Sequence, residues 1–167
     1  MATQKTQGYQ ALNIYKSDNA NIPYTKIVAK GVTDTAFNNF LIAVSGTFTP
    51  FTQTVYAGDI VYNTDTQTAA TVIKVQNDST LELNGPIFSN AGGGENFTVF
   101  SASAVTNYQD ANNGCVLYIG TAGDLTVDTI AGSENVLFKS VPVGFFPVQV
   151  KKVYSTGTVA KDIVALW

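Results

Sequence analysis

The chain has 167 residues and a net charge of −3, with nine lysines, no arginine and no histidine. Arginine is the residue best suited to phosphate and base contacts, and histidine is the commonest general base and metal ligand. Their absence argues against a nucleic-acid partner and against most enzymes, so we expect no catalytic residues, no cofactor and no metal site. Only 13% of the residues are charged, which is common on proteins whose faces are covered by neighbouring subunits.

The sequence contains few signals for a compartment or for reactive chemistry. The start, MATQKTQGYQ, has no apolar stretch of signal-peptide length, and no run approaches the roughly 18 apolar residues of a membrane helix. We therefore expect that the chain is made in the cytoplasm and has no membrane partner. The single cysteine, Cys115, lies in the apolar run 115–119 and has no histidine to activate it, which predicts a buried core thiol.

The apolar residues alternate along most of the chain, and Gly, Asn and Asp interrupt them at short intervals. This pattern is typical of a β-sandwich or a β-barrel, so the expected fold class is all-β. The best helical candidate, residues 35–40, is short and could equally be an extended connection.

The first two thirds of the chain divide into an arm and a barrel. Residues 1–32 are expected to form an N-terminal arm, with a polar turn at 17–23. Residues 33–101 have the pattern of a small SH3-like barrel, with Gly92–Gly94 as a flexible hairpin tip. Strands are expected here at residues 41–44, 47–51, 54–57, 60–63, 68–75, 80–83 and 95–100.

The last third of the chain contains a connector and a second β domain. Residues 102–113 are polar and indicate a connector, and residues 114–167 form a small β-sandwich or barrel. Pro147 favours an edge or a bulge in its strand. A terminal strand that ends in Trp167 is usually tied into a sheet, so Trp167 is predicted to anchor a core or an interface. Strands are expected here at residues 116–119, 125–130, 135–140, 145–154 and 162–167.

Several C-terminal motifs carry a resemblance to a known family. They are LYIGTAGD (117–124), VLFKSVPVG (136–144), FPVQVKKV (146–153) and TGTVAKDIVALW (156–167), together with SDNANIP (17–23) near the start. In this order they resemble the head spike base proteins of phages and gene transfer agents. The resemblance covers residues 13–23 and 114–167. Residues 33–101 have no counterpart in short members of that family, which suggests an inserted barrel.

The resemblance implies a virion structural protein on the outside of a phage capsid, either a head spike base or a decoration (cement) protein. The implied partners are the major capsid protein, further copies of the chain in a cyclic pentamer or trimer and, where one is carried, a head fibre. The alternative is a carbohydrate-binding or host-adhesion module of a phage particle, using Tyr and Asn residues of the barrel. A glycosidase needs only two carboxylates and stays a disfavoured third interpretation.

Six aromatic residues are candidates for an interface with a partner. Phe145 and Phe146 are neighbours whose side chains point to opposite faces of a strand, so only one of them can enter a given core. The other can face a partner, unless the strand is buried on both sides or bulges at Pro147. The tyrosines of the arm have little core of their own, and tyrosine is enriched at interfaces. The six candidates are Tyr9, Tyr15, Tyr24, Phe145, Phe146 and Trp167.

Two carboxylates also lie close together in the sequence. Asp124 and Asp128 are four residues apart in an expected strand, so both would face the same side. A cation site would use such a pair, but carboxylates spaced along a strand rarely converge on one ion. We therefore interpret the pair as part of a solvated strand face.

Overall fold

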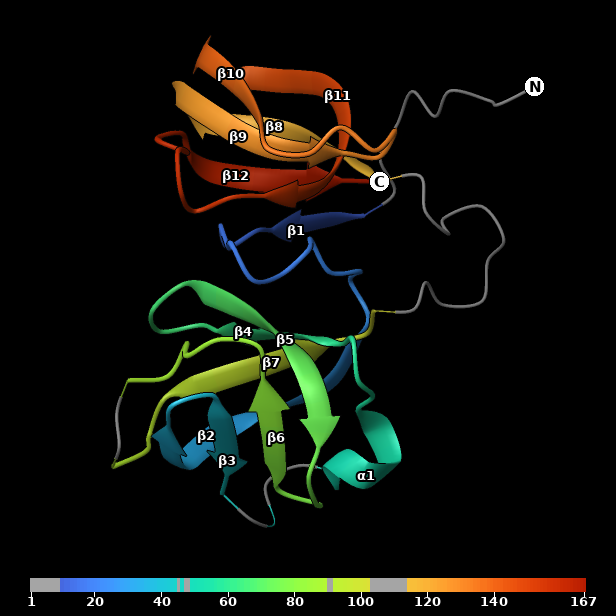
Figure 1. The fold of residues 1–167 in the computed structure, drawn as a ribbon, viewed down its shortest axis with the longest axis vertical. Coiled ribbons are helices and arrows are strands. Elements are labelled where there is room, and N and C mark those ends of the chain that lie inside the picture. Colours follow the sequence, from blue (N-terminus) through green and yellow to red (C-terminus); the bar gives the residue numbers. More distant parts are fainter. Residues whose placement is uncertain (1–9, 45, 47–48, 90–91, 103–113) are drawn as a thin grey trace, which may run out of the picture. The chain divides into compact units, whose positions relative to one another are not determined.

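The structure is a computed structural model, and it describes residues 10–44, 46, 49–89, 92–102 and 114–167 (Figure 1). Every described element is a strand except one four-residue helix, which confirms the all-β expectation. The chain divides into two compact units. We refer to Met1–Asp18 with Thr106–Trp167 as the sheet unit, and to Asn19–Val105 as the barrel unit.

The barrel unit is a closed antiparallel barrel of six strands (Figure 1). Its strands follow one another around the ring in the order β2-β3-β6-β5-β4-β7, and β7 closes the ring on β2. The strands are β2 (Ile27–Phe37), β3 (Phe40–Ala43), β4 (Ile60–Asn63), β5 (Thr68–Val75), β6 (Thr80–Leu83) and β7 (Asn96–Phe100). The barrel expected from the sequence is therefore present.

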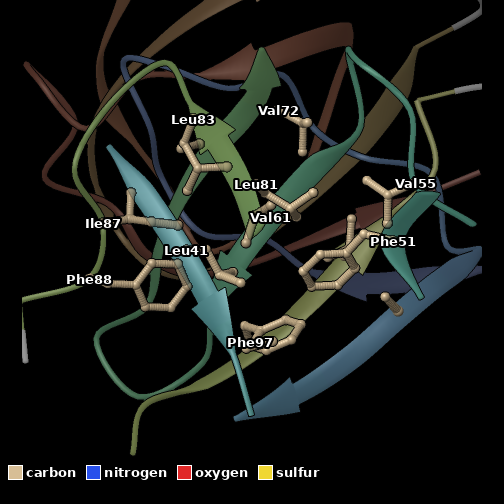
Figure 2. Close-up of a cluster of buried hydrophobic side chains, with 14 residues drawn as sticks. Leu41, Phe51, Val55, Val61, Val72, Leu81, Leu83, Ile87, Phe88 and Phe97 are labelled. Atoms are coloured by element: carbon tan, nitrogen blue, oxygen red, sulfur yellow. The ribbon is translucent and has the colours of Figure 1, made fainter. Parts of the chain in front are cut away.

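Alternate residues of the barrel strands fill its interior, as Figure 2 shows. Leu81 and Leu83 point inward from β6, and Phe97 and Val99 point inward from β7, because side chains two apart on a strand share a face. The ring of Phe97 meets the edge of Phe51 at a centroid distance of 6.0 Å. These side chains are almost completely removed from solvent, so the barrel has a core of its own.

The helix α1 (Phe51–Thr54) replaces two strands that we expected at residues 47–51 and 54–57, of which 47 and 48 lie outside the described residues. Pro50 is its N-cap, where a residue without an N–H costs nothing. The backbone N–H of Phe51 donates to the Asp78 carbonyl at 2.9 Å, which holds the helix against the β5–β6 turn. The helix thereby places Phe51 into the barrel core, and this tertiary contact overrides the β-like local sequence.

Two other segments of the barrel, residues 35–40 and Gly92–Gly94, can be compared with what the sequence led us to expect. Residues 35–40 form the β2–β3 hairpin, in which Asn38 has a φ of 52°, so the extended alternative holds and not the helix. At the expected flexible tip, Gly92 and Gly94 are exposed, but Gly93 between them is packed tightly. Gly93 is buried, and a Cβ there would lie 1.8 Å from the carbonyl oxygen of Asp34 on β2. Only glycine allows this close approach.

The sheet unit is one antiparallel sheet of six strands in the order β1-β12-β8-β11-β9-β10. Strand β11 pairs with β8 up to Val150 and with β9 beyond it, and the pairing is irregular around Pro147, where a bulge was expected. Burial raises the pKa of the Cys115 thiol to about 12, so it is the core thiol expected. The strands are β1 (Ala11–Asn13), β8 (Cys115–Thr121), β9 (Gly123–Thr129), β10 (Val136–Val141), β11 (Gly144–Val153) and β12 (Lys161–Leu166).

The N-terminal segment is bound into the sheet unit up to Asp18. The backbone N–H of Ile14 donates to the Ile163 carbonyl at 3.1 Å, and that of Ser17 to the Val153 carbonyl at 3.0 Å. The Asp18 carboxylate accepts hydrogen bonds from the Thr156 N–H at 3.0 Å and from both hydroxyls of the 155–156 turn. The barrel unit is therefore inserted after residue 18.

This boundary corrects the arm that we expected at residues 1–32. Residues 27–32 belong to the barrel, because they are the first part of β2 and pair with β7 through contacts such as Ala29 with Val99. The reason for the error is that a period-two pattern does not say which sheet a strand joins.

Candidate interaction surface

The neighbouring residues Phe145 and Phe146 point to opposite faces of β11, as the sequence predicted. Phe146 is 6% exposed and meets the edge of Phe138 at a centroid distance of 4.8 Å, on the side of the sheet core. Phe145 is 75% exposed. It lies opposite Tyr118 of β8, and the two rings form an edge-to-face pair with centroids 5.7 Å apart. The pair stands on the outer face of the sheet.

The outer face around this pair is apolar over four adjacent strands. The strand register aligns one row of side chains across β1, β12, β8 and β11, and a second row across β1, β12 and β8. We call these residues the outer patch. The first row is Asn13, Val164, Tyr118 and Phe145, and the second row is Ala11, Leu166 and Val116.

The outer patch contains no Asp, Glu or Lys, and Asn13 is its one amide. None of the seven residues is buried. Four of them are exposed: Ala11, Asn13, Tyr118 and Phe145. An antiparallel sheet that faces water on one side normally alternates apolar and polar residues. Here β8 has apolar residues on both faces, and so has β12 beyond the exposed Asp162, so a second apolar surface is available beyond the core.

The two edges of the sheet are less suited to contact a partner. Strand β10 lies at one edge, where Lys139 is exposed and reaches to 3.8 Å from Asp124. Ser140 has a φ of 51°, and the pairing of β10 shifts between Phe138 and Val141. Lysines and bulges on an edge strand hinder the addition of another strand. The other edge, β1, is only three residues long.

The remaining predicted interface residues are distributed over both units. Trp167 is partly exposed, and its backbone N–H donates to the Gln10 carbonyl at 3.1 Å, so the chain end is tied to the sheet. Tyr15 lies in the sheet unit and Tyr24 in the barrel unit, and both are partly exposed. Tyr9 lies outside the described residues. Of the five candidates that the structure describes, only Phe145 belongs to the outer patch.

Sequence reasoning missed most of the patch, although a signal was present. Residues 115–119 and 163–167 are continuous apolar runs and do not alternate with polar residues. Such runs are typical of strands buried on both faces. The signal therefore pointed to Val116, Tyr118 and Val164, but it was used only to predict strands.

The carboxylates have structural roles. The Asp124 carboxylate accepts a hydrogen bond from the backbone N–H of Ser140 on β10 at 2.8 Å. The buried Asp128 carboxylate accepts one from the backbone N–H of Asn135, just before β10, at 2.9 Å. Each carboxylate therefore holds a neighbouring backbone segment in place. In the part of the chain that the structure describes, no group of three His, Cys, Asp or Glu residues could hold a metal ion. The interpretation as a cation site therefore gains no support.

One buried polar pair in the barrel was not foreseen. The carboxylate of Glu95 accepts a hydrogen bond from Asn63 Nδ2 at 3.0 Å and another from the Ser89 N–H at 3.1 Å. Asn63 Nδ2 also donates to the Ile87 carbonyl at 2.8 Å. Since both side chains are buried and bonded within the barrel, they stabilise the segment between β6 and β7.

Comparisons with protein-family models, with curated proteins and with solved structures find no match to this chain. The resemblance to head spike base proteins thus stays a prediction. Within the described residues, no helix has the length and apolar character needed to cross a membrane.

Proposed function

We propose that this chain is a non-enzymatic structural protein on the outside of a phage capsid, as a head spike base or decoration protein. It acts by protein–protein contact, and the outer patch is the surface that makes this contact. The observation that carries the proposal is the exposed pair Tyr118–Phe145 in a patch whose seven residues carry no charge. The resemblance of residues 13–23 and 114–167 to head spike base proteins is the reason for proposing a phage capsid as the partner.

The chemistry of the patch suits association. Contiguous exposed apolar residues mark interaction sites, and aromatic residues are enriched at the centres of interfaces. Phe145 alone would contribute roughly 1.5–3 kcal/mol if a partner buried it fully. The patch contains no carboxylate, amine, imidazole or thiol, so binding is the role that its side chains support.

The barrel unit is available for a second contact. Each strand of its closed ring pairs with a neighbour on both sides, and the exposed apolar side chains Tyr56 and Ile73 lie on its surface. In a spike base this unit would meet the head fibre. In the alternative function, as a host-adhesion module, Tyr56 would be the residue that contacts a glycan.

The experiment that tests the proposal is incorporation into particles. Particles would be purified from a strain that lacks the gene and is complemented with the native chain or with Phe145→Ser. We expect the native chain in the particles and strong loss of Phe145→Ser, although circular dichroism shows both to be folded. The matched control is Val159→Ser, which replaces an exposed apolar residue of the sheet unit outside the outer patch (62% exposed) and should be incorporated normally.

Two results would contradict the proposal. One is a native chain that is absent from purified particles. The other is equal incorporation of the native chain and Phe145→Ser. Glycan binding that depends on Tyr56, together with incorporation into particles that does not depend on Phe145, would favour the adhesion alternative.

A further inference from the structure

The chain passes from the sheet unit to the barrel unit between two consecutive residues, Asp18 and Asn19. The linker between two folded units usually contains exposed residues that bind to neither of them. Here both residues are held by hydrogen bonds, each within its own unit, so this crossing contains no free linker residue.

Asp18 is fixed to the sheet unit through both its side chain and its backbone. Its carboxylate accepts hydrogen bonds from the Thr156 N–H at 3.0 Å and from the hydroxyls of Ser155 and Thr156 at 2.8 and 2.6 Å. Its carbonyl oxygen accepts a hydrogen bond from Lys152 Nζ at 2.6 Å. Because this carbonyl shares a planar peptide group with the Asn19 nitrogen, that nitrogen is held with the sheet unit as well.

Asn19 is fixed to the barrel unit, also through its backbone and its side chain. Its carbonyl oxygen accepts hydrogen bonds from the Thr71 hydroxyl at 2.9 Å and from Asn84 Nδ2 at 2.5 Å. Its side chain lies against Gly85, where an added Cβ would be 2.5 Å from Asn19 Nδ2. The carbonyl group and the side chain of Asn19 therefore follow the barrel unit.

One backbone rotation lies between these two sets of anchors. The Asn19 nitrogen follows the sheet unit and the Asn19 carbonyl follows the barrel unit, so the torsion that separates them is φ of Asn19. Steric repulsion confines φ of a residue other than glycine mostly to values between about −60° and −160°, an arc of roughly 100°. Rotation about this one bond turns the barrel unit relative to the sheet unit, but it cannot separate the two units at this point.

The second crossing between the units is much longer. The Ala102 N–H donates to the buried Asp59 carboxylate at 2.8 Å within the barrel unit. Gly114 lies against β11, where an added Cβ would be 2.8 Å from the Val150 carbonyl oxygen. Between these anchors are residues 103–113, which lie outside the described residues. A chain of this length can reach up to roughly 40 Å, so its length does not prevent rotation at Asn19.

We propose that Asn19 is a single-residue pivot about which the barrel unit turns relative to the sheet unit. The pivot goes beyond the proposed function and does not rest on it, since its basis is the set of anchors on either side of the crossing. If the sheet unit binds a capsid, the pivot lets the barrel unit change direction while the sheet unit stays bound.

Matched insertions test the pivot. Gly-Ser-Gly would be inserted between Asp18 and Asn19 in one variant, and between residues 106 and 107 in the other. Spin labels on Val159→Cys in the sheet unit and Ile73→Cys in the barrel unit report the distribution of distances by double electron–electron resonance. Both sites are exposed, and the native thiol is buried with its pKa raised to about 12, so it is not labelled. Labels on Tyr56→Cys and Ile73→Cys, both in the barrel unit, give the width that the labels alone produce.

The widths of the distributions decide the outcome. The native chain should give a wider distribution than the pair within the barrel, because the barrel unit turns about one bond. Insertion between Asp18 and Asn19 should widen it at least twofold further, since three unanchored residues are added to a single torsion. The same insertion at residues 106–107 should leave the width unchanged. Equal widening by both insertions, widening by neither, or a native width equal to that within the barrel would overturn the pivot.

A variant of native length keeps the test decisive if an insertion prevents folding, which circular dichroism and thermal melting would reveal. Asp18→Ala removes the carboxylate anchors and should widen the distribution, but less than the insertion does. Asp34→Ala replaces an exposed aspartate of the barrel unit and should leave the width unchanged. A distribution that is equally narrow in Asp18→Ala and in the native chain would also overturn the pivot.

Discussion

The barrel unit encloses its apolar strand faces within a ring of its own strands, whereas the sheet unit has apolar side chains on both faces of β8 and β12. In the barrel, Phe97 and Leu81 are fully covered by neighbours from other strands of the ring. In the sheet, Phe146 is covered in the same way but Phe145 is not. A closed barrel has no free edge and needs no partner, while a sheet with a second apolar face is complete only when something covers it.

The largest expected contrast is between a phenylalanine in each unit. Phe97→Ala should lower the free energy of unfolding by about 3–5 kcal/mol, because it removes a large buried side chain and leaves a cavity. Phe145→Ala should cost less than about 1 kcal/mol in the isolated chain, since the exposed ring loses little beyond its contact with Tyr118. Chemical denaturation measures both. Equal losses would show that Phe145 is part of a core.

A smaller effect is expected from glycines in the barrel. Gly93→Ala places a Cβ 1.8 Å from the Asp34 carbonyl oxygen, so β2 and the segment before β7 must separate. Gly94→Ala meets no atom within 4 Å and has only the conformational cost of its φ of 89°, about 1–2 kcal/mol. Thermal unfolding should therefore show a larger loss for Gly93→Ala. The reverse order would contradict the tight approach to β2.

A modest pH dependence is expected from the anchor of the N-terminal segment in the sheet unit. Burial alone would raise the pKa of Asp18, but hydrogen bonds from Thr156 and Ser155 outweigh it and lower this pKa. The anchor therefore contributes stability above the unfolded pKa of about 3.9, and this contribution is lost as the pH falls through the lower folded value.

Denaturation as a function of pH checks the anchor. Asp18→Asn should be less stable than the native chain at neutral pH, and the difference should shrink in acid. Asp34→Asn, an exposed charge-matched variant in the barrel, serves as the control. A difference between the native chain and Asp18→Asn that is unchanged down to pH values below both pKa values would show that the carboxylate does not act as an anchor.

The smallest effect is expected when the barrel is removed. Excising residues 19–102 retains every described strand of the sheet unit, and it keeps residues 103–113, part of the connector expected from the sequence, which lie outside the described residues. Its hydrogen bonds from Gln10 to Asp18 should still hold β1 against β12. Circular dichroism and a cooperative melt should report a folded sheet. An unfolded remainder would mean that the sheet unit depends on the barrel.

Most strands could be predicted from the sequence, because alternation and turn residues are local. Thr68–Val75 and Thr80–Leu83 match the strands that the turn at 77–79 separates. The helix at Phe51 could not be predicted, because it is stabilised by the packing of Phe51 into a core that forms only when the barrel closes. The tight approach of Gly93 to β2 likewise depends on pairing that no local pattern specifies.

The candidate site was predictable in part for the same reason. The opposition of Phe145 and Phe146 follows from strand geometry alone. The aligned rows do not, because they require the register of β12 on β8, where Val164 lies opposite Tyr118. Continuous apolar runs indicate two-sided burial, but the sequence does not say which face remains uncovered within one chain.

The proposed function requires above all that the outer patch is covered in the assembled particle. Maleimide labelling of Asn13→Cys measures this directly, because Asn13 is exposed in the single chain and the buried native thiol does not react. The same site should react quickly in the isolated chain at micromolar concentration and much more slowly in purified particles. Equal labelling rates in the free chain and in the particle would show that the patch stays open to solvent and would contradict the proposed function.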